Sequence, residues 1–178
     1  MKKTTLIIAL AVLAVSAFAQ KKTTTSATVK FDAATPLDAL PVAENKTVVA
    51  AIDTKKGTVA FEAVVKSFNF SNPMMQEHFN GERWFNSEKF PKTTFTGKIT
   101  NLSAINFSKN GTYEAKIEGE LTMKGITKPL STTATITVNG DVLITASEFT
   151  IALADYDISD AKGKIAKEPK IFVSAELK

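Results

Sequence analysis

Apolar and polar residues alternate along much of this chain, most clearly between residues 113 and 138. From Tyr113 to Met123 the odd-numbered positions are apolar or small, and the even-numbered positions are polar. After Gly125 the apolar phase moves to the even-numbered positions. A period of two is that of a β-strand with one buried face. We therefore predict two antiparallel strands, 113–123 and 130–138, joined by a turn over 124–129.

Asn-Gly pairs mark two further turns. Asn110-Gly111 lies between Phe107 and Tyr113, and pairing these two aromatic residues in a hairpin predicts a three-residue loop over 109–111 with Gly111 in the left-handed conformation. A three-residue loop over residues 139–141 would likewise pair Val138 with Val142. Matched pairs of this kind would fix the register of the strands.

Alternation predicts further strands in the rest of the chain, and a slip of the apolar phase between Val65 and Phe68 predicts a β-bulge. These strands span about 25–33, 46–53, 57–70, 93–107, 141–153 and 169–177. The total is about eight antiparallel strands in an all-β fold. Closure into an up-and-down, lipocalin-like barrel would remove the exposed edges, and a β-sandwich is the competing architecture. A barrel of eight strands can be packed solid or can hold one small ligand.

One segment, residues 72–91, interrupts the strands and concentrates unusual side chains. It contains the only His (His78), the only Trp (Trp84), and the adjacent Met74 and Met75. Asn72-Pro73 at its beginning is typical of a helix start, and Gly81 marks the expected end of a short helix. An amphipathic insert between strands, rich in large apolar groups, is suited to cover an apolar cavity.

The first residues have the pattern of a secretory signal peptide. Lys2 and Lys3 precede an apolar run, and Ala17-Phe18-Ala19 has the small-x-small pattern of a cleavage site. The apolar run is too short to span a bilayer. We therefore expect a signal peptide over 1–19, cleavage near Ala19, and a single domain over 20–178 that is exported to the periplasm or secreted.

Cysteine usage and charge exclude several classes. The sequence contains no Cys, so no disulfide framework and no lipidated Cys are available. Lys and Arg number 22 and Asp and Glu 18, for a net charge of +4, and the charges are interspersed. The sequence therefore has no cluster of basic residues of the kind that binds nucleic acid. We expect no nucleic-acid partner, no stable membrane span in the mature chain, and a monomer or homodimer.

Two segments resemble signature stretches of the YceI-like family of lipid- or polyisoprenoid-binding proteins. They are residues 78–95, HFNGERWFNSEKFPKTTF, and residues 119–130, GELTMKGITKPL. With Asp155-Tyr156, the resemblance covers roughly residues 57–177. It implies an exported eight-stranded barrel that encloses a long apolar ligand, commonly an isoprenoid chain, without enzymatic activity and without a cofactor.

The ligand-binding residues are predicted from inward alternation and from the insert. They share an apolar or aromatic character, except for one candidate head-group contact, His78. The set is Phe61, Val65, Phe68, Met74, Met75, His78, Phe79, Trp84, Phe95, Ile99, Tyr113 and Ile117. Alternation alone does not separate a cavity lining from a packed core. Met74 and Met75 have the stronger claim, because adjacent helical positions point about 100° apart and thioethers repack easily.

Catalysis lacks its usual residues in this sequence. His78 has Glu77 and Glu82 nearby, but there is no Cys, no Gly-x-Ser-x-Gly elbow and no second His for a zinc site. A structural role for His78 is favoured, with a head-group contact as the second interpretation. We therefore expect no catalytic residue and no metal site.

Three classes of function remain. The first is an exported carrier that sequesters a polyisoprenoid or another lipid. The second is a packed barrel that serves as an envelope-stress or interaction module without a ligand, and the third is a small lipid-modifying enzyme. Whether the barrel has a hollow interior decides between the first two.

Overall fold

The computed structural model describes residues 20–36, 42–158 and 165–178. The predicted signal peptide, 1–19, lies outside these residues. The described chain is almost entirely β-sheet, with one short α-helix and three 3-10 turns. The strands are β1 (Lys21–Asp32), β2 (Val42–Asp53), β3 (Thr58–Val64), β4 (Asn69–Phe70), β5 (Lys92–Ile99), β6 (Gly111–Met123), β7 (Ile126–Asn139), β8 (Val142–Thr150) and β9 (Lys170–Leu177).

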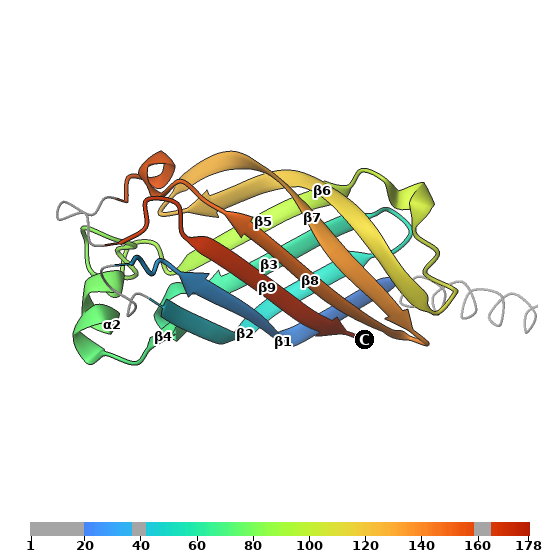
Figure 1. Cartoon of the computed structure of the whole chain (residues 1–178), viewed down its shortest axis with the longest axis horizontal. Coiled ribbons are helices and arrows are strands. Elements are labelled where there is room, and N and C mark those ends of the chain that lie inside the picture. Colours follow the sequence, from blue (N-terminus) through green and yellow to red (C-terminus); the bar gives the residue numbers. More distant parts are fainter. Residues whose placement is uncertain (1–19, 37–41, 159–164) are drawn as a thin grey trace, which may run out of the picture.

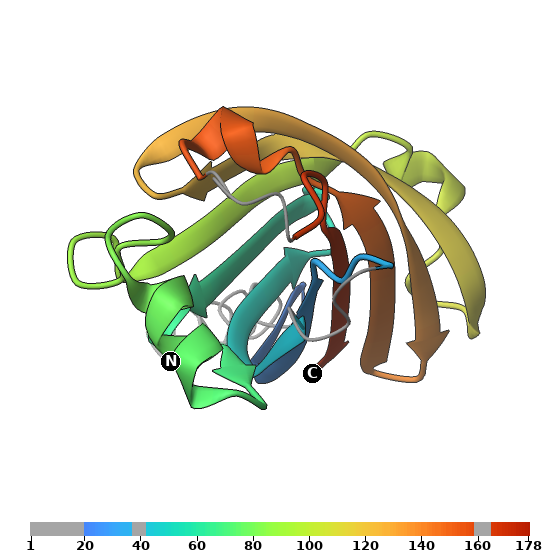
Figure 2. The same cartoon turned by 60° about the vertical axis from the view of Figure 1, so that its left-hand side comes forward.

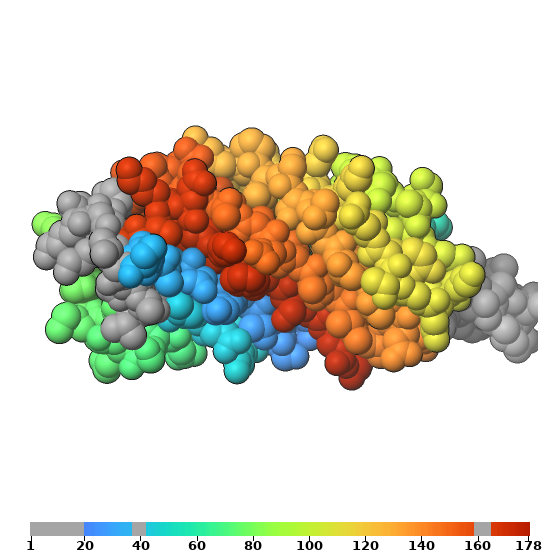
Figure 3. Space-filling model, in the orientation of Figure 1, coloured from blue at the N-terminus to red at the C-terminus, as the bar shows by residue number. Residues whose placement is uncertain are grey.

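Eight of these strands form a closed antiparallel barrel. The order is β1-β9-β8-β7-β6-β5-β3-β2, and β1 also pairs with β2, which closes the ring (Figures 1 and 2). The face drawn in Figure 3 has β1, β9 and β8 side by side. The two-residue strand β4 pairs with β2 at Ala43 and Glu44, beyond the part of β2 that pairs with β3. The predicted eight-stranded barrel is confirmed, and the sandwich is excluded.

The β6–β7 hairpin has the predicted pairing but a tighter turn. Met123 pairs with Ile126, so the turn consists of Lys124 and Gly125, with φ of +50° and +76°. Positive φ at both positions suits a two-residue hairpin, whose twist matches that of the strands. A side chain at Gly125 would come within 2.7 Å of the Phe90 ring. The predicted turn over 124–129 was too long, since β7 already begins at Ile126.

The β7–β8 hairpin differs from the prediction by one residue. Asn139 pairs with Val142 across a two-residue turn, and Gly140 has a φ of +58°. Val138 therefore lies opposite Leu143, and both are buried. The predicted Val138–Val142 pair was wrong, because the loop is two residues long and not three.

The predicted strand 93–107 ends early, at Ile99, and the Phe107–Tyr113 hairpin does not form. Beyond Ile99, the side-chain amide of Asn101 takes the place of backbone hydrogen bonds to β6. Its Nδ2 donates to Glu114 O at 2.9 Å, and its Oδ1 accepts from Lys116 N at 2.8 Å. The chain then turns through η2 (Leu102–Ala104). Gly111, with a φ of +157°, opens β6 opposite Val138 and does not adopt the left-handed conformation predicted for it.

The phase slip after Val64 is a 3-10 turn and not the predicted bulge. β3 ends at Val64, and η1 (Val65–Ser67) follows, with Phe68 N donating to Val65 O at 3.2 Å. Fully buried Asn45 on β2 holds the end of β3 through its Nδ2, 3.0 Å from Val64 O. The turn buries both Val65 and Phe68, which explains the slip in the apolar phase.

The insert contains the predicted helix, α2 (Pro73–Asn80). The Asn72 side chain accepts a hydrogen bond from Met74 N at 2.9 Å, and Pro73 occupies the first turn, where its missing N–H is not needed. Gly81 follows the helix as the sequence predicts. The helix lies at one end of the barrel (Figure 1).

Candidate functional site

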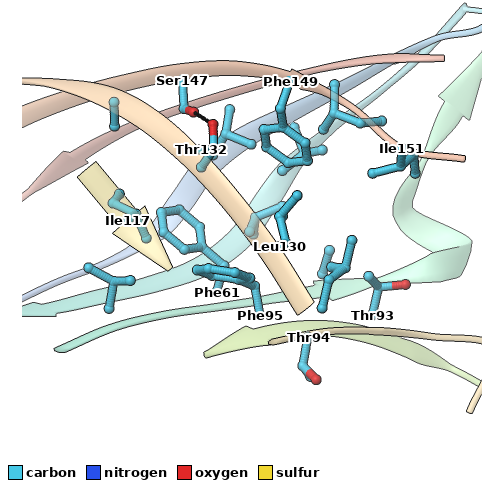
Figure 4. Close-up of a pocket in the computed structure, with 18 of the residues that line it drawn as sticks. Phe61, Thr93, Thr94, Phe95, Ile117, Leu130, Thr132, Ser147, Phe149 and Ile151 are labelled. Carbon is cyan, nitrogen blue, oxygen red and sulfur yellow. Dashed lines mark hydrogen bonds between the residues drawn. The ribbon is translucent and has the colours of Figure 1, made fainter. Parts of the chain in front are cut away.

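The barrel is hollow in part. A cavity of about 130 Å³ lies inside it, and all eight barrel strands contribute to the lining (Figure 4). The lining is apolar apart from five hydroxyl-bearing residues: Thr93, Thr94, Thr132, Thr145 and Ser147. No charged side chain lines the cavity among the described residues. Such a surface suits a hydrocarbon, since burying apolar area is favourable and an unpaired charge would be costly there.

Two neighbouring aromatic rings line the cavity. Phe61 and Phe95 are direct neighbours across the β3–β5 ladder, and both line the cavity (Figure 4). The Phe95 ring packs over two opposed glycines, because a side chain at Gly97 or Gly119 would come within 2.8 or 2.7 Å of it. The glycines give this ring the space in which it lies, as in the aromatic covering of glycines in other sheets.

An aromatic cluster closes the α2 end of the cavity. Phe79, the one buried residue of α2, is only 2% exposed. Its ring lies within 6.5 Å of five other aromatic rings, centroid to centroid. These rings belong to Phe31, Phe68, Phe70, Trp84 and Phe85. Phe79 thus joins the insert to the barrel wall and to the cavity lining.

Five of the twelve predicted site residues lie around the cavity. They are Phe61, Phe68, Phe79, Phe95 and Ile117. Val65 and Ile99 are buried in the surrounding core and do not line the cavity. Tyr113 is half-buried, and its hydroxyl donates to Lys109 O at 3.0 Å. Their role in binding stays a prediction.

The remaining four predicted residues lie outside the cavity lining. Met74 is 64% exposed, and Met75 is half-buried. His78 is exposed on the helix surface. Trp84 is half-buried and packs on Phe79 at 6.5 Å. Because α2 buries only Phe79, the adjacent methionines cannot both face the cavity.

The lining also includes residues that the prediction did not contain. They lie mainly on β7, β8 and β9, and include Leu130, Thr132, Ser147, Phe149 and Val173. Alternation in 141–153 carries a signal for Ser147 and Phe149, which share the phase of Leu143. Ser147 is polar, however, and a polar residue at an inward position cannot be told from an outward one by sequence alone. Only the structure shows that Ser147 faces inwards.

Ionisable groups lie away from the cavity. Tyr156 in η3 (Leu153–Tyr156) is 4% exposed. Burial raises the pKa of its phenol above the usual value of 10.0, and the neighbouring Asp155 carboxylate raises it further. In residues 20–36, 42–158 and 165–178, no group of three or more His, Cys, Asp or Glu side chains is placed to bind a metal ion. No helix in the same ranges is long and apolar enough to cross a membrane.

The sequence profile of the YceI-like domain family matches residues 14–177, nearly the whole chain. The chain belongs to the YceI-like family. No curated protein matches this YceI-like chain in sequence.

Solved structures share the fold of this YceI-like barrel at low identity. A polyisoprenoid binding domain from Saccharophagus degradans superposes with a TM-score of 0.75 at 11% identity, over 89% of this chain and 98% of that one. BcnA of Burkholderia cenocepacia gives 0.64 at 19%, over 90% and 97%. The Campylobacter jejuni YceI protein gives 0.52 at 20%, over 74% and 80%. These similarities show a common barrel.

Proposed function

We propose that this YceI-like barrel is a non-enzymatic carrier that sequesters a long apolar lipid, such as a polyisoprenoid, outside the cytoplasm. The observation that carries the proposal is the cavity lined by residues of all eight barrel strands, with a lining of hydrocarbon and a few hydroxyl groups. Each CH₂ group buried from water contributes about 0.8 kcal/mol, so chain length alone gives useful affinity. The Saccharophagus degradans domain with the same fold is described as polyisoprenoid binding, which supports the proposal.

The size of the cavity determines how a chain would be accommodated. A volume of about 130 Å³ is comparable to engineered protein cavities that bind one benzene molecule. A longer lipid chain therefore fits only if aromatic side chains in the lining rotate away from the cavity. Phe61 and Phe95 are the candidates, because both are only half-buried and both border the cavity.

Export is the second part of the proposal. Lys2 and Lys3, the apolar run after them and the small-x-small pattern of Ala17-Phe18-Ala19 support a removable leader over residues 1–19. Cleavage after Ala19 would leave β1, which begins at Lys21, intact. The mature protein would then act in the periplasm or outside the cell.

Native mass spectrometry of the protein purified from the exported fraction tests both parts together. We expect a chain that begins near Gln20 and carries an extractable lipid. A chain that retains residues 1–19 would contradict export. A uniform apo mass, together with no binding of added polyprenyl or fatty-acyl probes, would contradict the carrier function and favour a packed interaction module.

Two substitutions locate the binding site. Ala134 is buried on β7 and lines the cavity, so Ala134→Leu fills the interior, and we expect it to weaken probe binding about tenfold or more by displacing chain atoms. Met74→Asp is the control, because Met74 is exposed outside the cavity and the substitution should leave affinity unchanged. Equal effects of the two changes would place the ligand elsewhere.

A further inference from the structure

The wall of the barrel separates along one seam. β7 pairs with β6 over its full length, from Ile126 to Val138, but it pairs with β8 only from Ala134 onwards. Beyond Ser147, β8 continues to pair with β9 alone. The place where the two strands part is called here the β7–β8 fork, and it comprises residues 130–133 of β7 and 147–149 of β8.

The sequence of β7 suits this arrangement. Pro129 lies in the half of β7 without a β8 partner. Proline cannot donate a backbone hydrogen bond and is confined in sheets to strands with a free edge. A proline here therefore breaks no pairing, and the separation is built into the strand.

Two hydroxyl groups bridge the fork. If the ladder continued, Thr133 would pair with Glu148, but Ser147 Oγ instead donates to Thr133 O at 2.7 Å. Thr132 Oγ1 lies 3.1 Å from Ser147 Oγ (Figure 4). Ser147 donates its one hydroxyl hydrogen to Thr133 O, so the single hydroxyl hydrogen of Thr132 has two acceptors within reach, Ser147 Oγ at 3.1 Å and Thr133 O at 3.3 Å. Both hydrogens are then used, and Thr132 Oγ1 keeps lone pairs that can accept.

The wall is also thin at this point. Ala146 and Ser147 border the internal cavity and two hollows on the outer surface. Both have short side chains, so little bulk separates the interior from solvent. A ligand whose chain occupies the cavity can therefore place its end at the fork.

We propose that the β7–β8 fork is the head-group site for the bound lipid, and that it selects a neutral hydrogen-bond donor such as a hydroxyl or primary amide. This inference rests on the proposed lipid-binding function. Thr132 Oγ1 accepts the donated hydrogen, and the hydrocarbon chain extends into the cavity. A carboxylate or phosphate finds no cationic partner in the described cavity lining, and its desolvation opposes entry. Lys30 lines one of the outer hollows, together with Glu44 and Glu148, and is paired with Asp32 at 3.2 Å. An ether or ketone has no hydrogen to donate.

Binding of geraniol and of its methyl ether tests the inference, because the ether carries a methyl group in place of the hydroxyl hydrogen and cannot donate a hydrogen bond. We expect the unmodified protein to bind geraniol about fivefold more tightly, the size of an ordinary net hydrogen bond. Thr132→Val keeps the shape of the side chain and should abolish the preference by weakening geraniol binding alone. Thr132→Ser restores an acceptor and should restore the preference.

Thr135→Val is the matched control, since Thr135 is an exposed position on the same strand and does not line the cavity. It should keep the preference for geraniol. Equal affinities of the unmodified protein for alcohol and ether, or a preference that survives Thr132→Val, would overturn the head-group site while leaving the carrier function intact. Failure of both probes and of longer prenyl chains to bind would overturn the two proposals together.

Discussion

The α2 end and the β7–β8 fork close the same cavity in different ways. At the α2 end, Phe79 contacts five aromatic rings and is almost fully buried. At the fork, small side chains and two hydroxyl groups form the wall. Aromatic packing of this extent contributes several kcal/mol, whereas each hydrogen bond contributes about 1 kcal/mol net. The sequence of the helical insert suggests a movable lid, but the insert is the more firmly anchored of the two closures.

The largest expected effect is the loss of the aromatic anchor. Phe79→Ala should lower the free energy of unfolding by about 3–5 kcal/mol, because it leaves a cavity amid five rings. Urea unfolding measures the change. Phe172→Ala is the control, since Phe172 is half-buried on the outer face of β9 and should cost less than about 1 kcal/mol. A similar cost for both would remove the distinction between the two closures.

Hydrogen exchange should reveal the weakness of the fork directly. Backbone groups of antiparallel strands point alternately to the two neighbours. Thr133 O faces β8, so the amides of Ser131 and Thr133 point to the unpaired side, while those of Leu130 and Thr132 point to β6. We expect the first pair to exchange at least about tenfold faster, a difference of about 1.4 kcal/mol. Equal protection in an NMR exchange experiment would show that the seam is closed in solution.

Hydroxyl pairing near the α2 end gives a third test. Thr93 Oγ1 is buried without a hydrogen-bond partner, in contrast to the paired hydroxyls of the fork. An unsatisfied buried hydroxyl is unfavourable, so Thr93→Val should stabilise the ligand-free protein by about 1 kcal/mol. Thermal unfolding measures it. Thr132→Val is the comparison and should be neutral or destabilising, because it breaks an existing bond; the opposite order would contradict the assigned pairing.

Alkaline pH gives the smallest expected effect. In the unfolded chain Tyr156 ionises near pH 10, whereas in the folded barrel burial and Asp155 hold the pKa of its phenol higher. The folded state thus keeps its proton longer, and stability falls as pH rises above about 10. In Tyr156→Phe, the drop in urea midpoint between pH 8 and pH 11 should be smaller than in the unmodified protein. Identical drops would contradict the raised pKa.

Period-two alternation was sufficient to predict the barrel, because burial of one face repeats strictly along β6 and β7. It failed where side chains replace backbone pairing. The Asn101 amide ends β5 by binding two backbone groups of β6, and buried Asn45 binds the end of β3. A single amide in a polar stretch gives no periodic signal, so both strand ends were placed too late.

The candidate site was predictable on one side of the barrel only. Phe61, Phe95 and Ile117 follow from alternation, and the structure places them around the cavity. Unusual composition drew attention to Met74, Met75 and His78, but composition does not show direction, and the helix turns only Phe79 inwards. Alternation places Thr132 in the inward phase of its strand, but it does not mark the hydroxyls of Thr132 and Ser147 as site residues, because inward polar residues look like outward ones in sequence. Pro129 was the available sign that β7 has a free edge.

The first and last strands of the chain lie side by side. Thr23 N donates to Lys178 O at 3.0 Å, and Lys178 N donates to Thr23 O at 3.2 Å, so Lys178 extends the contact between β1 and β9. Pairings between the ends of a chain form slowly, because the whole intervening length must be ordered first. Until β9 is synthesised, β1 and β8 remain open edges that can pair with other chains. A chain that lacks β9 would thus be an aggregation-prone sheet and not a slightly shortened barrel.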